Sequence, residues 1–383
     1  MNHGVASPLS LVLVLSACDG AGPALPADSG SDASAADTAD RFDCSGEADP
    51  GRDVAFLAIL ARLDAQRCLQ EADILLVEAH MADEYVHASL YCDAVYRVSS
   101  PDGLVFAGEP ERVLNHASVP DVVITDSGEH VLVYNDVTPF RLVELLRTDP
   151  ARLWRQGMLG YGGVGMSVTT PGAAATEVLD LDLQFGELQE AVDADLGRKA
   201  DGTWHVAWLG VRVDDMIDGR GPLFSRMPHH FFRSHSEDLR NFSTPVVAVA
   251  SNEGSTGGVD PTIVDLVDGG EILFVSPLDR YAMGWSSPDG AQWAPEAAPD
   301  VVTTVPGATA DALTVNGAYR MHYMQNGEFG HFRYSTSNDG RTWQEGGTLL
   351  RTTDGFNTSV ARAPDGTWWL YYNRNEAGCL DGA

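Results

Sequence analysis

The sequence predicts an all-β fold, a five-bladed β-propeller in which strands from the two ends of the chain complete one blade. A strand–turn–strand pattern recurs five times, and the glycines of its turns lie 74, 67, 48 and 49 residues apart. The last two steps match the length of one propeller blade, and the first two match a blade with an insertion. The five copies span residues 119–134, 192–208, 260–275, 308–323 and 357–372.

The copy between Gly258 and Ser276 shows the pattern most clearly. Residues 262–266 and 272–275 are β-branched and apolar on either side of an Asp-Gly-Gly turn, which is typical of a β-hairpin. The segment 281–293 supplies a third strand, a turn and a short fourth strand. Four antiparallel strands in under about fifty residues are the amount of chain that one propeller blade needs.

A second recurring motif forms the outer half of each blade. It reads Ser-x-Asp-(Gly/Leu)-x-x-(Phe/Trp) and occurs at residues 100–106, 236–242, 287–293 and 337–343. The first outer strand pair, Ser89–Val113, precedes every hairpin, whereas the last hairpin has no outer pair after it. We therefore expect the N-terminal strands to complete the blade begun by the C-terminal ones, which removes the free sheet edges of an open array.

The N-terminal region predicts export. Residues 1–17 resemble a signal peptide, and Leu15-Ser16-Ala17-Cys18 resembles the lipobox of bacterial lipoproteins, in which the cysteine is lipidated. The alternative is an ordinary cleaved signal with an incidental cysteine. Residues 18–50 are rich in Ala, Gly, Ser and Asp, and we expect a disordered acidic tether. Residues 51–84 form a predicted helical segment, and residues 85–383 form the propeller.

Charge restricts the partners. The formal net charge is −31, which argues against nucleic acid and against an anionic membrane surface as partners. No run after the signal is long enough to span a bilayer, so we expect membrane attachment through the lipid on Cys18 alone. The predicted protein is a monomeric, extracytoplasmic lipoprotein.

Five cysteines fit this location. If Cys18 carries lipid, four remain for disulfides in an oxidising compartment. We favour Cys44–Cys68, which would join the tether to the helical segment, and Cys92–Cys379, which would lock the closing blade. Free buried thiols are the alternative.

Acidic and amide side chains open the first strand of each blade, and those strands line the central channel of a propeller. The candidate channel residues are Asp121, Asp193, Asp195, Asp260, Asp311 and Asn357. An Asp at a strand start often only accepts backbone N–H bonds from an adjoining turn. Converging carboxylates could instead perform acid–base chemistry, or hold a cation such as Ca²⁺.

The hairpin Val259-Asp260-Pro261-Thr262 with Asp268-Gly269 resembles the blade motif of the five-bladed propeller glycosidases, which include arabinanases, xylosidases and invertase-like fructosidases. The outer turns also resemble sialidase Asp-boxes, with one residue fewer between Asp and Gly. The resemblance covers about residues 85–383.

That resemblance implies three acids on successive blades: a base or nucleophile Asp, an orienting Asp and a Glu general acid. By position, Asp121 would be the base, Asp193 the orienting acid, and Asp260 would stand where the Glu belongs. No blade has Glu at the matched position; Glu190 and Glu253 lie a few residues ahead.

Two functions remain open. The first is an exported glycosidase-like enzyme that hydrolyses poly- or oligosaccharides with paired carboxylates. The second is a non-catalytic propeller that binds a glycan or a protein. A Glu that reaches the channel beside Asp121 and Asp193 favours the enzyme, and its absence favours the binding protein. Beyond a possible Ca²⁺, the sequence indicates no cofactor.

Overall fold

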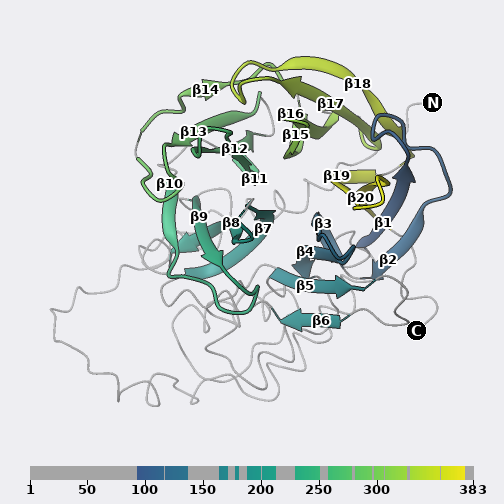
Figure 1. The fold of residues 1–383 in the computed structure, drawn as a ribbon, viewed down its shortest axis with the longest axis horizontal. Helices are drawn as coiled ribbons and strands as arrows, with labels where there is room; N and C mark the ends of the chain where they lie inside the picture. The colour runs from purple at the N-terminus through teal and green to yellow at the C-terminus, as the bar shows by residue number, and fades with distance from the viewer. Residues whose placement is uncertain are drawn as a thin grey trace, which may run out of the picture.

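The computed structural model describes residues 93–115, 117–136, 164–170, 177–180, 188–199, 201–212, 229–250, 258–277, 281–295, 297–305, 307–325, 328–353 and 355–375. Within these ranges, twenty strands form five four-stranded antiparallel sheets. The sheets stand as blades around one axis, so the predicted five-bladed propeller is confirmed (Figure 1). A search of the described residues for an apolar helix long enough to cross a bilayer found none.

Four blades are continuous in sequence, and each runs from the axis outward. Blade 1 has β3 (Ala117–Ile124), β4 (His130–Asp136), β5 (Val164–Thr169) and β6 (Glu177–Asp180). Blade 2 has β7 (Leu188–Arg198), β8 (Trp204–Arg212), β9 (His229–Ser236) and β10 (Val246–Ala250). Blade 3 has β11 (Gly258–Asp265), β12 (Glu271–Pro277), β13 (Met283–Ser287) and β14 (Val301–Val302). Blade 4 has β15 (Gly307–Val315), β16 (Ala318–Gln325), β17 (His331–Ser337) and β18 (Gln344–Arg351).

Blade 5 joins the two ends of the chain, as the sequence predicts. Its inner strands are β19 (Gly355–Arg362) and β20 (Trp368–Asn375), and its outer strands are β1 (Asp93–Ser100) and β2 (Glu111–Asn115). β1 pairs with β20 over its whole length, from Asp93 opposite Asn375 to Ser100 opposite Trp368. Because β1 pairs with β20, the strands from the two chain ends form one four-stranded blade, and neither strand pair is left as an open two-stranded sheet.

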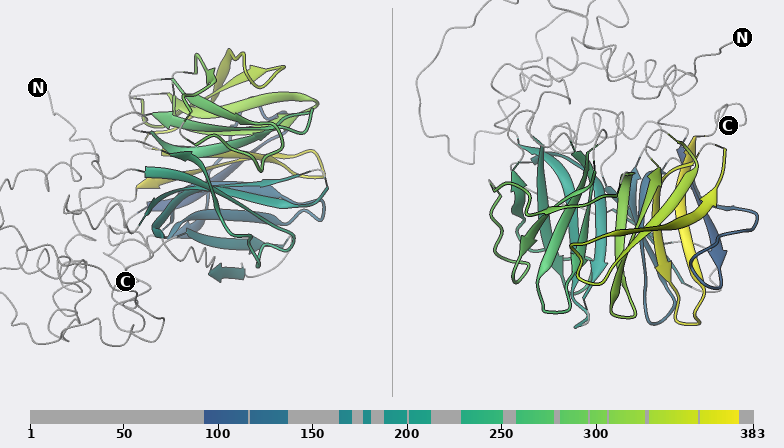
Figure 2. Two further views of the ribbon diagram at one scale, coloured as in Figure 1. Left: turned by 90° about the vertical axis from the view of Figure 1, so that its left-hand side faces the viewer. Right: turned by 90° about the horizontal axis from the view of Figure 1, so that it is seen from above.

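The inner hairpins owe their recurrence to turn geometry. The five glycines on which the repeats align, Gly128, Gly202, Gly269, Gly317 and Gly366, have φ between 79° and 93°. Side chains disfavour this region, so each hairpin needs glycine at this position. All five turns lie at the ends of the inner strands, on the face opposite their starts (Figure 2).

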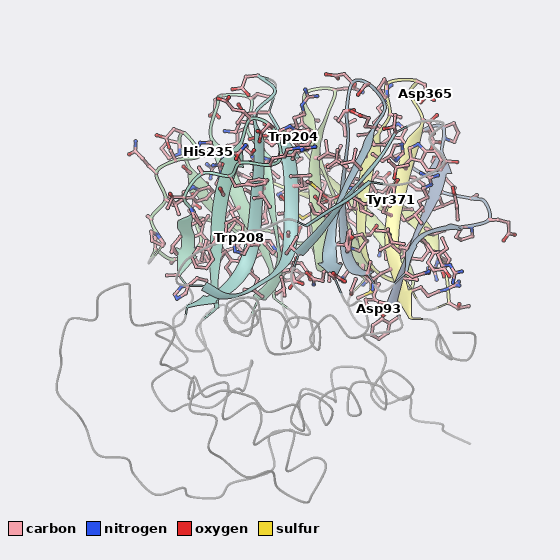
Figure 3. The ribbon with its side chains drawn as sticks, turned by 90° about the horizontal axis from the view of Figure 1, so that it is seen from below. Asp93, Trp204, Trp208, His235, Asp365 and Tyr371 are labelled. Carbon is pink, nitrogen blue, oxygen red and sulfur yellow. The ribbon has the colours of Figure 1, made fainter. Side chains whose placement is uncertain are left out.

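Apolar packing holds the blades together. Five clusters of buried side chains lie between neighbouring blades, one at each of the five blade contacts. Trp204 and Trp208 of β8, for example, pack with Val131 and Val133 of β4. Figure 3 shows these side chains filling the space between the sheets. A core distributed around the ring keeps the inner strands in a fixed register with one another.

The outer Ser-x-Asp turns are structural. In the turn after β17, the Ser337 hydroxyl donates to Asp339 Oδ1 at 2.9 Å, and the same oxygen accepts the N–H groups of Arg341 and Thr342 at 2.8 and 2.7 Å. The turns that begin at Ser100, Ser236 and Ser287 repeat this arrangement. These carboxylates therefore fold the turns and are not available to a ligand.

Several predictions concern residues outside the described ranges. They are the signal peptide (1–17), the lipidated Cys18, the tether (18–50), the helical segment (51–84) and the disulfides Cys44–Cys68 and Cys92–Cys379. They stay predictions.

Candidate functional site

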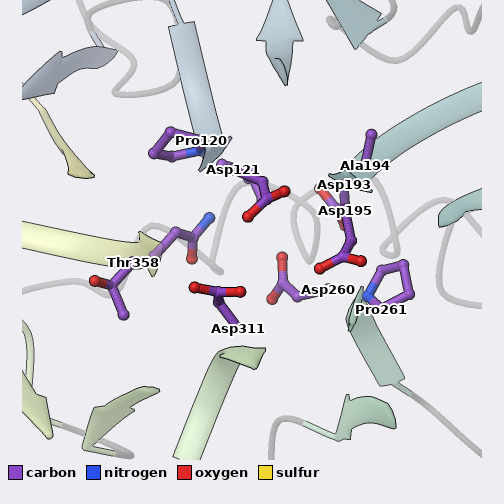
Figure 4. A pocket seen from close by; sticks show the side chains of 11 residues that line it. Pro120, Asp121, Asp193, Ala194, Asp195, Asp260, Pro261, Asp311 and Thr358 are labelled. Carbon is purple, nitrogen blue, oxygen red and sulfur yellow. The ribbon is translucent and has the colours of Figure 1, made fainter. Parts of the chain in front are cut away.

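An acidic pocket lies on the propeller axis, at the face where the inner strands begin. Its volume is about 300 Å³, part of it open to solvent. Figure 4 shows the carboxylates of four blades pointing toward a common centre. All six predicted channel residues line this pocket, together with Val119, Pro120, Ala194, Pro261 and Thr358. No lysine, arginine or histidine is among the described residues that line it.

A β-bulge opens every inner strand and sets the direction of the pocket side chains. The ladder shifts register between Ser118 and Asp121 in β3, and at the matching place in the other four inner strands. Four residues at the bulges have left-handed backbone: Val119 (φ 48°), Asp193 (53°), Asp260 (48°) and Asn357 (46°). We call these four residues the bulge layer. Asp and Asn tolerate this region better than other residues, whereas for a β-branched valine it is strained.

A second layer lies two residues further along each inner strand. It consists of Asp121, Asp195, Thr262, Asp311 and Ser359, which we call the axial belt. Each belt side chain accepts a hydrogen bond from a backbone N–H of the next blade. Leu196 donates to Asp121 (2.6 Å), Ile263 to Asp195 (3.0 Å), Ala312 to Thr262 (3.1 Å), Val360 to Asp311 (2.9 Å), and Val122 to Ser359 (3.1 Å). The five bonds form a closed circle around the axis.

The axial belt gives three of the predicted acids a structural role. In Asp121, Asp195 and Asp311, one carboxylate oxygen accepts a hydrogen bond from the neighbouring blade. The other oxygen of Asp121 accepts a hydrogen bond from the Ser359 hydroxyl at 2.7 Å. The sequence-based alternative, in which strand-start acids accept backbone N–H groups, therefore holds for these three. Their partners lie in the next blade and not in a local turn.

The bulge layer contains two acids, Asp193 and Asp260, that do not take part in the circle of belt hydrogen bonds. The Asn135 side chain from β4 holds Asp193 twice: its Nδ2 donates to Asp193 Oδ1 at 2.7 Å, and its Oδ1 accepts the Asp193 N–H at 2.8 Å. Asp260 follows in the next blade and is buried. Its carboxylate feels the charge of Asp193, and its backbone N–H donates to the Asp193 side chain.

Burial raises the pKa of every acid in the pocket. It raises the pKa of Asp121 to about 7, with a further rise from the charge of Asp311, and raises the pKa of Asp311 to about 7. The pKa of Asp195 lies well above 3.8 for the same reasons. Burial raises the pKa of Asp193 to about 6, although hydrogen bonds from Asn135 and the Asp260 backbone oppose the rise.

No hydrogen bond from the described part of the chain opposes the burial of Asp260. Its pKa lies well above 3.8 because its carboxyl is buried and because Asp193 repels a second charge. Asp193, whose charged form accepts hydrogen bonds from Asn135 and the Asp260 backbone, is therefore the acid of the pair that ionises more readily, and Asp260 is the one that binds its proton more strongly.

The belt acids also offer the donors of a cation site. Oxygens of Asp121, Asp195 and Asp311 lie within 4.8 Å of one another. Oxygen ligands suit Ca²⁺, which takes six to eight of them, and these three carboxylates would hold such an ion on the axis. An ion there would lower the pKa values of the three acids.

Sequence reasoning missed several residues of the site. It did not select Val119, Asn135, Thr262 or Ser359, and it placed Asp121 and Asp193 at equivalent positions. The distance to the turn glycine of each blade separates the two layers. Three bulge-layer residues lie nine residues before that glycine: Asp193, Asp260 and Asn357. Four belt residues lie seven residues before it: Asp121, Asp195, Thr262 and Ser359. The structure does not describe the side chains of Glu190 and Glu253. Among the described residues that line the pocket, none is a glutamate.

No protein-family model matches the sequence, and no curated protein sequence matches it. Solved structures do resemble the model. They include a GH43_1 enzyme from Xanthomonas citri (13% identity, TM-score 0.43, covering 70% of this chain and 89% of that one). An N-acetylgalactosamine deacetylase from F. plautii shares 13% identity, with a TM-score of 0.45 and 74% and 95% covered. The β-xylosidase RS223 shares 12%, with a TM-score of 0.43 and 68% and 92% covered. The five-bladed fold itself rests on the strand pairing described above.

Proposed function

We propose that this propeller acts on carbohydrate outside the cell and cleaves glycosidic bonds in its axial pocket. The observation that carries this proposal is the Asp193–Asp260 pair, two adjacent carboxyls whose surroundings give them different proton affinities. Glycosidic cleavage needs one protonated and one ionised carboxyl on either side of the bond. The signal and lipobox predicted at residues 1–18 would place the site at the cell surface.

In this mechanism Asp260 is the general acid. Its proton passes to the glycosidic oxygen as the bond between that oxygen and the anomeric carbon breaks. Asp193 is ionised above about pH 6 and assists the attack on the anomeric carbon, either by accepting a proton from water or as the nucleophile. Asn135 holds the Asp193 carboxylate in place through both of its hydrogen bonds.

Asp121 is a weaker candidate for the base than its position in the sequence suggests. Both of its oxygens accept hydrogen bonds within the axial belt, and its pKa of about 7 leaves it partly protonated at neutral pH. We therefore propose Asp193 for that role and assign Asp121 to the floor of the pocket. The base role of Asp121 implied by the family resemblance stays a prediction.

Substitution of each acid tests the proposal. The full-length protein is screened against aryl glycosides, arabinan, xylan and fructan, with release of reducing sugar as the readout. Asp193→Asn and Asp260→Asn should each lower the rate by about 10²–10⁴-fold, because each removes one half of the acid–base pair. Asp289→Asn, in an exposed outer turn, is the matched control and should keep the wild-type rate.

Two outcomes would change the account. If Asp121→Asn lowers the rate as much as Asp193→Asn, the base role returns to Asp121. If the wild-type protein binds a polysaccharide but hydrolyses none of the substrates, the second candidate is supported. That candidate, a non-catalytic glycan-binding propeller, is favoured by two observations: Val119 replaces an acid in the bulge layer, and no glutamate lines the described pocket.

A further inference from the structure

Two exposed aromatic side chains occupy equivalent loops in neighbouring blades. Among the described Phe, Tyr and Trp residues, only Tyr281 (50%) and Phe329 (46%) are exposed. Tyr281 lies in the link between β12 and β13, and Phe329 lies in the link between β16 and β17. Both links join the second strand of a blade to the third.

Both loops lie on the face that contains the acidic pocket. The second strand of blade 4 ends at Gln325, which pairs with Gly307 at the start of β15. In blade 3, Pro277 pairs in the same way with Gly258 at the start of β11. Since the inner strands start on the face that contains the pocket, both exposed aromatic residues lie on that same face.

Phe329 is close to the pocket lining. Its ring packs edge-on against Phe356, with the centroids 6.5 Å apart and the planes at 86°. Phe356 is directly followed in β19 by Asn357 and Thr358, which line the pocket. Phe329 is thus linked to the pocket lining through Phe356, its contact in β19.

Backbone bonds hold Phe329 in this exposed position. Gly330 N–H donates to Gly355 C=O at 2.5 Å, and Thr352 N–H donates to Gly330 C=O at 2.8 Å. Gly330 has φ 73°, and a Cβ there would collide with the Thr352 carbonyl, so the chain is fixed where it passes between these strands. An aromatic ring whose following residue is fixed by backbone bonds loses little entropy when a ligand binds it.

Tyr281 is anchored by its neighbour. Ala282 is fully buried, its C=O accepts the N–H of Thr303 at 3.1 Å, and its N–H donates to Val305 C=O at 3.4 Å. The tyrosine side chain nevertheless stays half exposed. Equivalent loops of two adjacent blades therefore each present one aromatic ring on the same face.

We propose that Tyr281 and Phe329 are sugar-stacking platforms, and that the ligand is an oligosaccharide or polysaccharide chain and not a single sugar. This inference rests on the proposed function of the axial pocket. Aromatic faces pack against the C–H faces of sugar rings. The Glu328 carboxylate beside Phe329 contacts His331 Nδ1 through Oε2 at 2.6 Å, and because it is exposed it can also accept hydrogen bonds from hydroxyls.

The size of the pocket supports a chain ligand. The void of about 300 Å³ includes open solvent, so its enclosed part is smaller than a typical small-molecule site and admits no more than part of one sugar unit. Further units of the same chain would lie outside the pocket, on the face that carries the two rings. There the two rings contribute affinity that grows with chain length.

Calorimetry with arabino-, xylo- and fructo-oligosaccharides of two and six units tests this inference. The full-length protein carries Asp260→Asn to prevent turnover. Phe329→Ala and Tyr281→Ala should each weaken hexasaccharide binding by roughly tenfold, the loss expected for one stacking contact, and leave disaccharide binding nearly unchanged. Phe329→Trp should restore the affinity. Val267→Ala, which alters a 78% exposed side chain in the turn of the opposite face, is the control.

The outcomes separate this inference from the function on which it rests. If the hexasaccharide binds the Asp260→Asn protein and both alanine variants equally well, the platforms are overturned and the pocket remains. If the hexasaccharide and the disaccharide bind the Asp260→Asn protein with equal affinity, the chain-length claim is overturned. If neither wild-type nor Asp260→Asn protein binds any of these sugars, the proposed function fails and the platforms fail with it.

Discussion

Val119 occupies a position in the pocket that aspartate occupies in the next two blades. Asp193 and Asp260 adopt the same left-handed backbone with φ of 53° and 48°, which their short polar side chains tolerate. Val119 adopts φ 48° with a branched Cβ, at a cost of about 1–3 kcal/mol. The fold imposes the bulge on every inner strand, so the valine is strained by its position and not by its own preference.

Relief of this strain is measurable. Val119→Asn should raise the free energy of unfolding by about 1 kcal/mol, because asparagine accepts the left-handed region. The reciprocal change Asn357→Val, at the equivalent position of blade 5, should lower it by at least as much. Chemical denaturation of the two variants checks both values. A Val119→Asn protein that is less stable than wild type would contradict the strain argument.

At the scale of one strand, the belt position of every blade accepts a backbone N–H from the next blade, although the residue type differs between blades. The axial belt needs an acceptor for a neighbouring N–H, and aspartate, threonine and serine all provide one. An unsatisfied buried N–H costs about 1–3 kcal/mol, so each belt bond stabilises a blade contact.

Thr262→Val removes one of these bonds, together with the hydrogen bond between the Thr262 hydroxyl and the Asp195 carboxylate. Valine has nearly the shape of threonine but no acceptor, so the Ala312 N–H loses its partner, and the free energy of unfolding should fall by about 1–3 kcal/mol. Thr314→Val, at an exposed position of β15, should change it by less than about 0.5 kcal/mol. Equal effects of the two substitutions would show that the belt bond does not contribute.

The sequence indicates some of these elements better than others. Turn glycines and β-branched runs repeat because left-handed turns and pleated strands require those residue types. The five blades and the closure of the ring can therefore be predicted from the sequence. The axial belt cannot be predicted from residue type, because the hydroxyls of Thr262 and Ser359 accept the same backbone N–H bonds as the aspartates. Asn135 was missed for a different reason: it reaches Asp193 from another blade, and nothing in the local sequence marks that contact.

At the scale of the molecule, ring closure gathers the acidic side chains of four blades in one buried pocket. Each inner strand carries its polar residues to the axis, and the pairing of β1 with β20 completes the circle that encloses them. Five aspartates from four blades thus share one small volume, where burial raises the pKa of each. A chain with a net charge of −31 keeps some of its acids protonated at this one place.

The measurement that tests this account most directly is a carbon-13 NMR titration of the aspartate carboxyls, in the wild type and in Asp193→Asn. In the wild type, Asp193 should titrate at about 6 and Asp260 well above 3.8. In Asp193→Asn, the pKa of Asp260 should fall, because a repelling charge is gone, yet remain above 3.8, because the carboxyl stays buried. If Asp260 instead titrates near 3.8 in both proteins, the pocket does not favour its protonated form and the proposed acid catalyst does not exist.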